Sequence, residues 1–206
     1  MSRARKDITH TRIARLAPAL VVPALAATVA VATAAPANAA GAEEFTGSTG
    51  TIVKAIPDQD AVSQKLVVNK AGKIKDVNVS FAAEHNVIAD LSFFLESPTG
   101  RLVHLTSGNG GNGDGYGSQN VDGCGSTATF NDEADVNVRD FEGVNTTFSG
   151  PYQPESRQLN QPTTGLSKLD GNRTKGAWKL IAADTDELAG GKLECFKLNF
   201  KYNPAN

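Results

Sequence analysis

Several acidic side chains stand at turns and at the ends of apolar runs, where their oxygens can converge on a metal ion. A hard cation such as Ca²⁺ takes about six to eight oxygen ligands, and carboxylates are common among them. We therefore expect a structural calcium ion held by some of these acids, with plain solvation of loop carboxylates as the alternative. The candidates are Asp90, Asp132, Glu133, Asp184 and Asp186, with Glu187 beside them.

Two histidines follow the N-terminal segment and are the only near-neutral bases there. His85 has Glu84 and Asp90 close in sequence, whereas His104 has no acid beside it. Neither belongs to a Gly-x-Ser-x-Gly or His-Glu-x-x-His motif, and peptide hydrolysis needs an activated nucleophile or a metal-bound water together with oxyanion stabilisation. We therefore predict no catalytic residues. His85 is expected to be a hydrogen-bonding loop residue, and His104 an outward-facing strand residue.

Residues 1–39 predict a secretory signal peptide. Basic residues come first, an apolar run follows from about Leu16 to Ala35, and Ala37-Asn38-Ala39 fits a signal-peptidase site. An uncleaved membrane anchor is the alternative, since the run is nearly long enough to span a bilayer. Pro18 and Pro23 weaken that alternative. We therefore expect a secreted, extracellular protein with no membrane contact after cleavage.

Cleavage after Ala39 makes the chain more acidic, because the removed segment contains five of the 20 Lys and Arg residues. The remaining part is the size of one domain. A negative net charge argues against a surface that binds the phosphates of nucleic acid. It is compatible with cation binding, although solubility alone would explain it.

The two cysteines, Cys124 and Cys195, both follow the predicted cleavage site. An even pair in an exported protein indicates a disulfide, and two buried free thiols are the alternative. Cys195 is expected on the outer face of its strand together with Lys197 and Asn199, where a loop cysteine can reach it. With so few histidines and cysteines, a zinc site is not expected.

Short runs of apolar residues separated by turn residues predict an all-β fold. No long window shows the spacing of an amphipathic helix, and many short strands with frequent turns indicate a sandwich or barrel. Residues 41–51 are expected to be a loose lead-in, and the glycine-rich residues 108–125 a surface loop. The predicted strands are 52–56, 66–68, 74–81, 91–96, 101–105, 126–130, 177–184 and 193–202.

The clearest local prediction is a β-hairpin over residues 91–105. Leu91, Phe93 and Leu95 alternate with more polar neighbours and share one face. The strand is then stopped by Ser97-Pro98-Thr99-Gly100, because proline pre-sets a turn φ and glycine accepts a positive one. The next apolar run starts at once, which is typical of a hairpin.

Four ordered stretches resemble one known family. Residues 90–100 (DLSFFLESPTG) resemble its "DL…L.SP.GT" core, 129–134 (TFNDEA) its "tFdDeA" turn and 150–155 (GPYQPE) its "G.Y.PE" segment. Residues 176–202 resemble "GtW.L…DT…G.L..W.L.f", with Phe196 in place of the second tryptophan. The family is the P domain, or Homo B domain, of kexin- and furin-like proprotein convertases and secreted bacterial proteases. The core positions of its motif here are Leu91, Leu95, Pro98, Gly100, Trp178 and Leu180.

The resemblance implies a jelly-roll β-sandwich of about eight strands, with few or no helices outside the signal peptide. It implies a division into residues 1–39 (signal peptide), 40–72 (lead-in and first strands) and 73–202 (P/Homo B-like domain). It also implies that Trp178 fills the core, and it favours the calcium prediction. The glycine-rich loop and both cysteines lie outside the family pattern.

Three functions remain open at this point. The first, and the one we favour, is a non-catalytic accessory or stabilising module that acts beside a separate secreted protease or a cell-envelope component. The second is the serine-endopeptidase activity with which the family is associated. The third is a carbohydrate-binding or cell-envelope-binding jelly roll, which would rest on Trp178 and Tyr116 as stacking platforms.

Overall fold

A computed structural model describes residues 41–117, 123–141, 147–158, 161, 164–187 and 189–205. The described residues all belong to one compact unit. The predicted signal peptide lies outside them. None of the described helices is long and apolar enough to cross a membrane.

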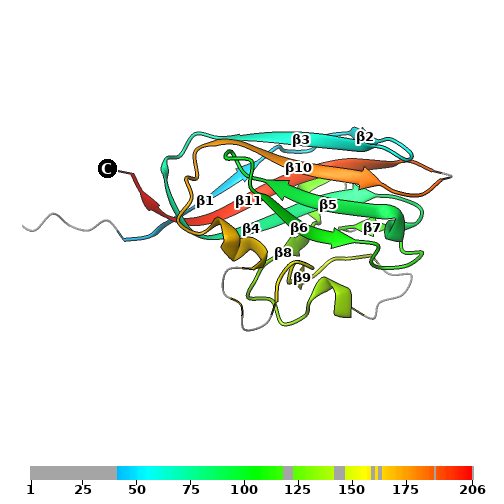
Figure 1. Ribbon diagram of the computed structural model, residues 1–206. Coiled ribbons are helices and arrows are strands. Elements are labelled where there is room, and N and C mark those ends of the chain that lie inside the picture. Colours follow the sequence, from blue (N-terminus) through cyan, green and yellow to red (C-terminus); the bar gives the residue numbers. More distant parts are fainter. Residues whose placement is uncertain are drawn as a thin grey trace, which may run out of the picture. The chain divides into compact units, whose positions relative to one another are not determined.

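The described strands form two sheets that pack face to face (Figure 1). All paired strands are antiparallel except β8 and β9, which are parallel. The larger sheet contains β1 (Glu43–Ser48), β2 (Lys54–Ile56), β4 (Gly72–Glu84), β7 (Gly115–Tyr116), β8 (Ala128–Phe130), β9 (Pro151–Tyr152) and β11 (Gly191–Pro204). The smaller sheet has the order β3 (Ala61–Val68), β10 (Gly176–Asp184), β5 (Leu91–Glu96) and β6 (Leu102–Ser107).

In the described part of the chain, helical structure is limited to short 3₁₀ turns, so the predicted all-β sandwich with few helices is confirmed there. The turns within the described residues are η1 (Ile88–Asp90), η2 (Gly123–Gly125), η3 (Val138–Asp140) and η4 (Gly165–Leu169). The described residues contain eleven strands where about eight were predicted. The jelly-roll strand order stays a prediction.

The core fills the space between the sheets with side chains from alternate strand positions. Val77, Val79 and Phe81 of β4 face inward and are fully buried. Phe81 stacks on Phe93 of β5, with ring centroids 4.3 Å apart, and so connects the two sheets. Trp178 is also fully buried, and its indole N–H donates to Thr174 O at 2.8 Å. Trp178 therefore fills the core, as the family resemblance implied.

The predicted hairpin is β5 and β6. Leu91 and Leu95 are completely buried. In the turn, the Ser97 N–H donates to Arg101 O at 2.9 Å, and Gly100 has a φ of +78° that side chains disfavour. A Cβ at Gly176 would lie 2.5 Å from Pro98, so this glycine lets the start of β10 pass close to the turn.

Two stretches expected to be loops instead contribute to the sandwich. Residues 43–48 form β1, because the edge of β11 is open to pairing there and Phe45 stacks on Phe200 with centroids 4.9 Å apart. The glycine-rich stretch contributes β7 and the buried Tyr116, which packs on Phe81, Phe93 and Phe148. The surface-loop prediction was therefore wrong for residues 115 and 116; residues 118–122 lie outside the described part.

Residues 43–68 belong to the same sandwich as the predicted P/Homo B-like region. β1 and β2 pair with β11, and β3 pairs with β10 across eight residue pairs, Gly176↔Val68 to Ala183↔Ala61. The first strands therefore form one edge of each sheet: β1 ends the larger sheet, and β3 ends the smaller one.

The predicted disulfide between Cys124 and Cys195 is confirmed. Cys195 lies on the outer side of β11, and the turn η2 carries Cys124 to it. The Lys197 ammonium also donates to Cys124 O at 3.0 Å. The bond therefore fixes the turn η2 on the outer side of β11.

Replacing both cysteines by alanine should lower the free energy of unfolding by about 4 kcal/mol, because the bond closes a loop with a sequence separation of 71 residues. Urea unfolding at equilibrium measures this loss. Reduced wild-type chain is the matched control and should unfold near the same midpoint as the double variant. A loss below about 1 kcal/mol would show that the bond constrains the unfolded chain little.

Candidate functional site

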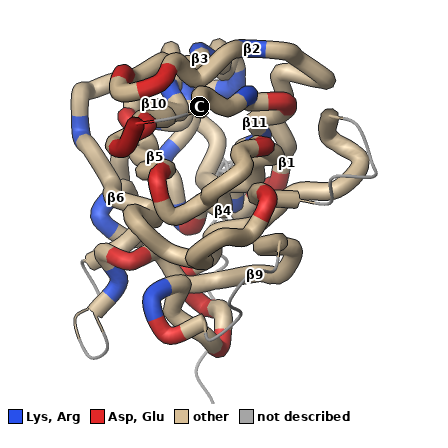
Figure 2. Tube along the Cα trace, turned by 90° about the vertical axis from the view of Figure 1, so that its right-hand side faces the viewer, with Lys and Arg blue, Asp and Glu red and all other residues tan. Residues whose placement is uncertain are grey.

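The predicted calcium ligands form two separate groups. Asp90, Asp184 and Asp186 meet where β5 begins and β10 ends, because the antiparallel register places Asp184 opposite Leu91. Asp132 and Glu133 follow β8 and contact different neighbours. Figure 2, which views one end of the strands, shows acidic residues on the loops there.

In the first group, His85 and Asp184 form a buried pair. Their side chains are 1% and 0% exposed, and His85 Nε2 lies 3.1 Å from Asp184 Oδ2. Because Nε2 also lies 2.6 Å from Ala189 O, it must carry a hydrogen and donate to both oxygens. His85 Nδ1 accepts from the Val87 N–H at 3.0 Å and also lies 2.6 Å from Val87 O. Both ring nitrogens are therefore engaged by neighbouring protein atoms.

This pair holds three chain segments together. Asp184 Oδ1 accepts from the Asp186 N–H at 3.2 Å, and Asp90 O accepts from the Thr185 N–H at 2.9 Å. A hollow of about 340 Å³ lies beside the pair. Burial, and then the charge of Asp186, raise the pKa of the Asp90 carboxyl. His85 was predicted to be a hydrogen-bonding loop residue, and it is; its partner Asp184, 99 residues away, was not foreseen.

In the second group, Asp132 is a buried anchor for the turn η4. Its Oδ1 accepts from the Leu166 N–H at 2.9 Å, and its Oδ2 accepts from the Ser167 N–H at 2.8 Å and the Ser167 hydroxyl at 2.5 Å. Gly165, with a φ of +66°, lets the backbone approach this carboxylate. Asp132 therefore satisfies the start of a 3₁₀ turn, where N–H groups lack partners.

Three further carboxyl groups surround this anchor. Burial raises the pKa of Asp76 and of Glu133, and each is raised further by neighbouring carboxylates. Partial burial, and then the charges of Asp76, Asp132 and Glu133, raise the pKa of Asp170 to about 6. The acids lie close enough to disfavour one another's charge.

A calcium ion would need several of these oxygens gathered in one place. No group of three or more His, Cys, Asp or Glu side chains within the described ranges is arranged to hold a metal ion. Asp132 and Asp184 already accept hydrogen bonds from the protein, which leaves fewer of their oxygens for a cation. Calcium binding therefore stays a prediction.

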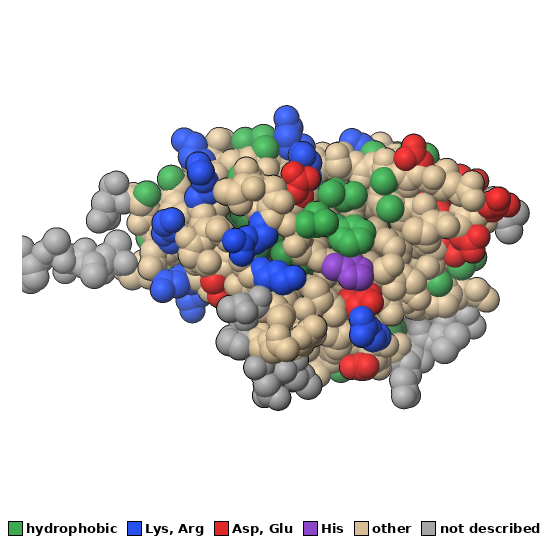
Figure 3. Space-filling model, in the orientation of Figure 1, with side chains coloured by type: hydrophobic (Ala, Val, Ile, Leu, Met, Phe, Trp, Pro, Cys, Tyr) green, Lys and Arg blue, Asp and Glu red, His purple; other side chains and the backbone are tan. Residues whose placement is uncertain are grey.

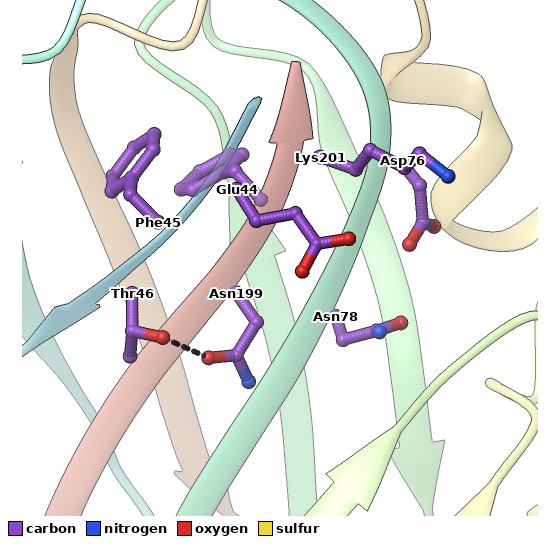
Figure 4. A pocket seen from close by; sticks show the side chains of 8 residues that line it. Glu44, Phe45, Thr46, Asp76, Asn78, Asn199 and Lys201 are labelled. Atoms are coloured by element: carbon purple, nitrogen blue, oxygen red, sulfur yellow. Dashed lines mark hydrogen bonds between the residues drawn. The ribbon is translucent and has the colours of Figure 1, made fainter. Parts of the chain in front are cut away.

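A polar groove of about 490 Å³ crosses β1, β11 and β4 on the outer face of the larger sheet (Figure 4). The strand register sets two rows of side chains: Thr46, Asn199 and Asn78 in one, and Glu44, Lys201 and Asp76 in the other. The Thr46 hydroxyl donates to Asn199 Oδ1 at 2.7 Å. Asn78 Oδ1 is buried and has no hydrogen-bond partner among the described residues.

The smaller sheet carries an apolar patch on its outer face, formed by Phe94, Ile181 and Leu102. The register places Phe94 of β5 opposite Ile181 of β10 on one side and opposite His104 of β6 on the other. The Phe94 ring stacks on His104 with centroids 4.8 Å apart, and Leu102 is 48% exposed. Figure 3 shows hydrophobic side chains gathered beside a histidine on this face. His104 points outward, as predicted.

Sequence reasoning missed both surfaces. The polar groove has a weak local signal, since Asp76 and Asn78 alternate with inward-facing Val77 and Val79. The alternation predicts which side chains face outward, but not that β4 lies beside residues 199–201 of β11. The aromatic residues that were offered as sugar platforms, Trp178 and Tyr116, are both buried, so that basis for carbohydrate binding is wrong.

Comparison with known proteins gives a structural likeness only. No protein-family model matches the chain, and no match was found among curated proteins. The fold is similar to that of a chain in the crystal structure of the Aeromonas sobria serine protease and chaperone complex, at 16% identity and a TM-score of 0.51. The match covers 80% of this chain and 27% of that one.

A crystal structure of the Aeromonas sobria serine protease also matches, at 15% identity and a TM-score of 0.49, over 78% of this chain and 27% of the other. The chain thus spans about a quarter of the length of the solved chains that it matches. At these identities, the likeness shows the fold alone.

Replacing Asp170 by asparagine should stabilise the fold at about pH 7 and have less effect at about pH 5. The pKa of this carboxyl is raised from 3.8 to about 6, so the folded state binds a proton that the unfolded state releases in that window. Protonation of Asp170 therefore stabilises the fold increasingly as pH falls through about 6, and this stabilisation is lost as pH rises above about 6. Urea midpoints at both pH values measure the effect.

The exposed Asp135, replaced by asparagine, is the matched control for removing one surface carboxyl group. If Asp170→Asn destabilised the fold at both pH values, the prediction would be wrong, because the charged Asp170 carboxylate would then make a net favourable contact.

Proposed function

We propose that this chain is a secreted, non-catalytic module of the P/Homo B type that binds and stabilises a separate secreted serine protease. The observation that carries the proposal is the likeness of its fold to about a quarter of a chain in the crystal structure of a serine protease and chaperone complex. The four ordered motifs from residue 90 to residue 202 support the same family.

The geometry of His85 supports a non-catalytic role. In a catalytic triad, one ring nitrogen faces a carboxylate and the other faces the nucleophile. Here one nitrogen faces Asp184, but the other lies 2.6 Å from the backbone carbonyl of Val87. A carbonyl oxygen occupies the nucleophile's place, and the side chains of the pair are almost completely buried. The pair is suited to holding loops together.

The apolar patch is the surface that we assign to the protease. Phe94 and Leu102 present aromatic and aliphatic area on an outer sheet face, and residues of this kind dominate the centres of protein interfaces. The Lys179–Glu96 ion pair, at 3.1 Å, borders the patch and supplies a polar rim. A protein bound at this face stabilises the protease by mass action, because it binds the folded form.

The proposal predicts that loss of the chain shortens the life of secreted proteolytic activity. Cells that lack the gene should release activity with a half-life at raised temperature about twofold or more shorter, and added purified chain should restore it. Phe94→Asp should fail to restore it, because a charge desolvated at an interface is costly. Val53→Asp is the matched control, since Val53 is 82% exposed and lies outside the patch.

An unchanged half-life in the deletion strain, or equal rescue by Phe94→Asp, would contradict the proposal. The purified chain should also fail to hydrolyse casein and fail to react with a fluorophosphonate, which labels activated serines. Covalent labelling of the folded chain would instead favour the endopeptidase alternative.

A further inference from the structure

The polar groove contains a buried acceptor that the described residues leave without a hydrogen-bond partner. Asn78 Oδ1 is shielded from water and has no partner among the described residues. A buried polar atom without a partner is unfavourable, so a donor placed there is favoured. Next to it, the Thr46 hydroxyl donates a hydrogen bond to Asn199 Oδ1 and thereby orients the side-chain amide of Asn199. The Asn199 NH₂ group remains as a donor.

The groove offers donors and acceptors in regular rows. The three side chains of each row come from adjacent strands, which lie about 4.8 Å apart. One row supplies a hydroxyl and two amides, and the other supplies two carboxylates and an ammonium. Both rows belong to paired strands, so the groups are held on a rigid floor. Their spacing suits a ligand with a hydroxyl group every few ångströms.

The charges of the groove exclude other ligand classes. Glu44 and Asp76 contribute two carboxylates against the single ammonium of Lys201, and the adjoining hollow adds one carboxylate, Glu133, and one ammonium, Lys75. An anionic ligand is therefore repelled. An apolar ligand would strip water from amides and carboxylates without replacing their hydrogen bonds. A neutral polyhydroxyl ligand donates to the carboxylates and to Asn78 Oδ1, and it accepts from the Asn199 amide.

We propose that the polar groove between β1, β11 and β4 binds a neutral saccharide. Its volume of about 490 Å³ lies within the range of small-ligand sites. The groove and the apolar patch lie on the outer faces of different sheets. A saccharide and a protein partner would therefore occupy opposite layers of the sandwich. The saccharide site is independent of the protease-binding proposal.

The test is a nuclear magnetic resonance titration of the purified chain with four oligosaccharides. Cellotetraose, chitotetraose and maltotetraose are the neutral probes, and tetragalacturonate is the acidic one. At least one neutral probe should give saturable shifts at the side-chain NH₂ signals of Asn78 and Asn199. Asn199→Ala should weaken that binding about tenfold or more. Thr46→Val is a second variant on an exposed strand and should weaken it as well.

Asn203→Ala is the matched control, because Asn203 is on the same strand β11 and outside the groove lining. It should bind the probe like wild type. The proposal is overturned if no neutral probe binds, if only tetragalacturonate binds, or if Asn199→Ala and Thr46→Val bind as tightly as the control. Thermal unfolding of each variant, run in parallel, identifies any loss that comes from misfolding.

Discussion

The stacking of Phe81 on Phe93 is the contact on which the rest of the structure depends. Phe81 lies in the long strand β4 of the larger sheet, and Phe93 lies in β5 of the smaller one, with centroids 4.3 Å apart. Tyr116 and Phe130 pack on Phe81 from the same layer. Aromatic burial of this kind supplies a large share of the hydrophobic stabilisation of a sandwich. Once these rings face inward, the period of two decides which neighbours face outward.

Two kinds of polar residue result: buried acids that hold loops, and residues on an outer sheet face that line the polar groove. Asp132 and Asp184 are each 4% exposed and have their oxygens engaged by backbone or side-chain donors. A buried charge is tolerated only when it is satisfied in this way, so these acids hold loops in place. Asn78 and Asn199 lie on an outer face instead. Two of the acids predicted as calcium ligands, Asp132 and Asp184, thus hold loops in place, and less conspicuous residues form the groove.

The sequence predicted those features that depend on local pattern. Leu91 and Leu95 face inward and the turn at Gly100 follows, because alternation and turn chemistry act over a few residues. The Cys124–Cys195 bond was predicted from cysteine number and from the outward position of Cys195. Features set by distant pairing were missed, since register joins residues that no local pattern relates. The His85–Asp184 pair spans 99 positions, and the edge strand β1 forms because β11 offers Phe200 to Phe45.

If both sheets, including the strands before residue 72, form one cooperative unit joined through Phe81, they should unfold together. Urea unfolding of the wild type and of Phe81→Ala tests this cooperativity. One probe is the fluorescence of the single tryptophan, Trp178, which lies in the smaller sheet. The other is far-ultraviolet circular dichroism, which reports both sheets. We predict coincident transitions in each protein and a loss of about 3–5 kcal/mol in the variant. Transitions that separate between the two probes, or a loss below about 1 kcal/mol, would contradict the account.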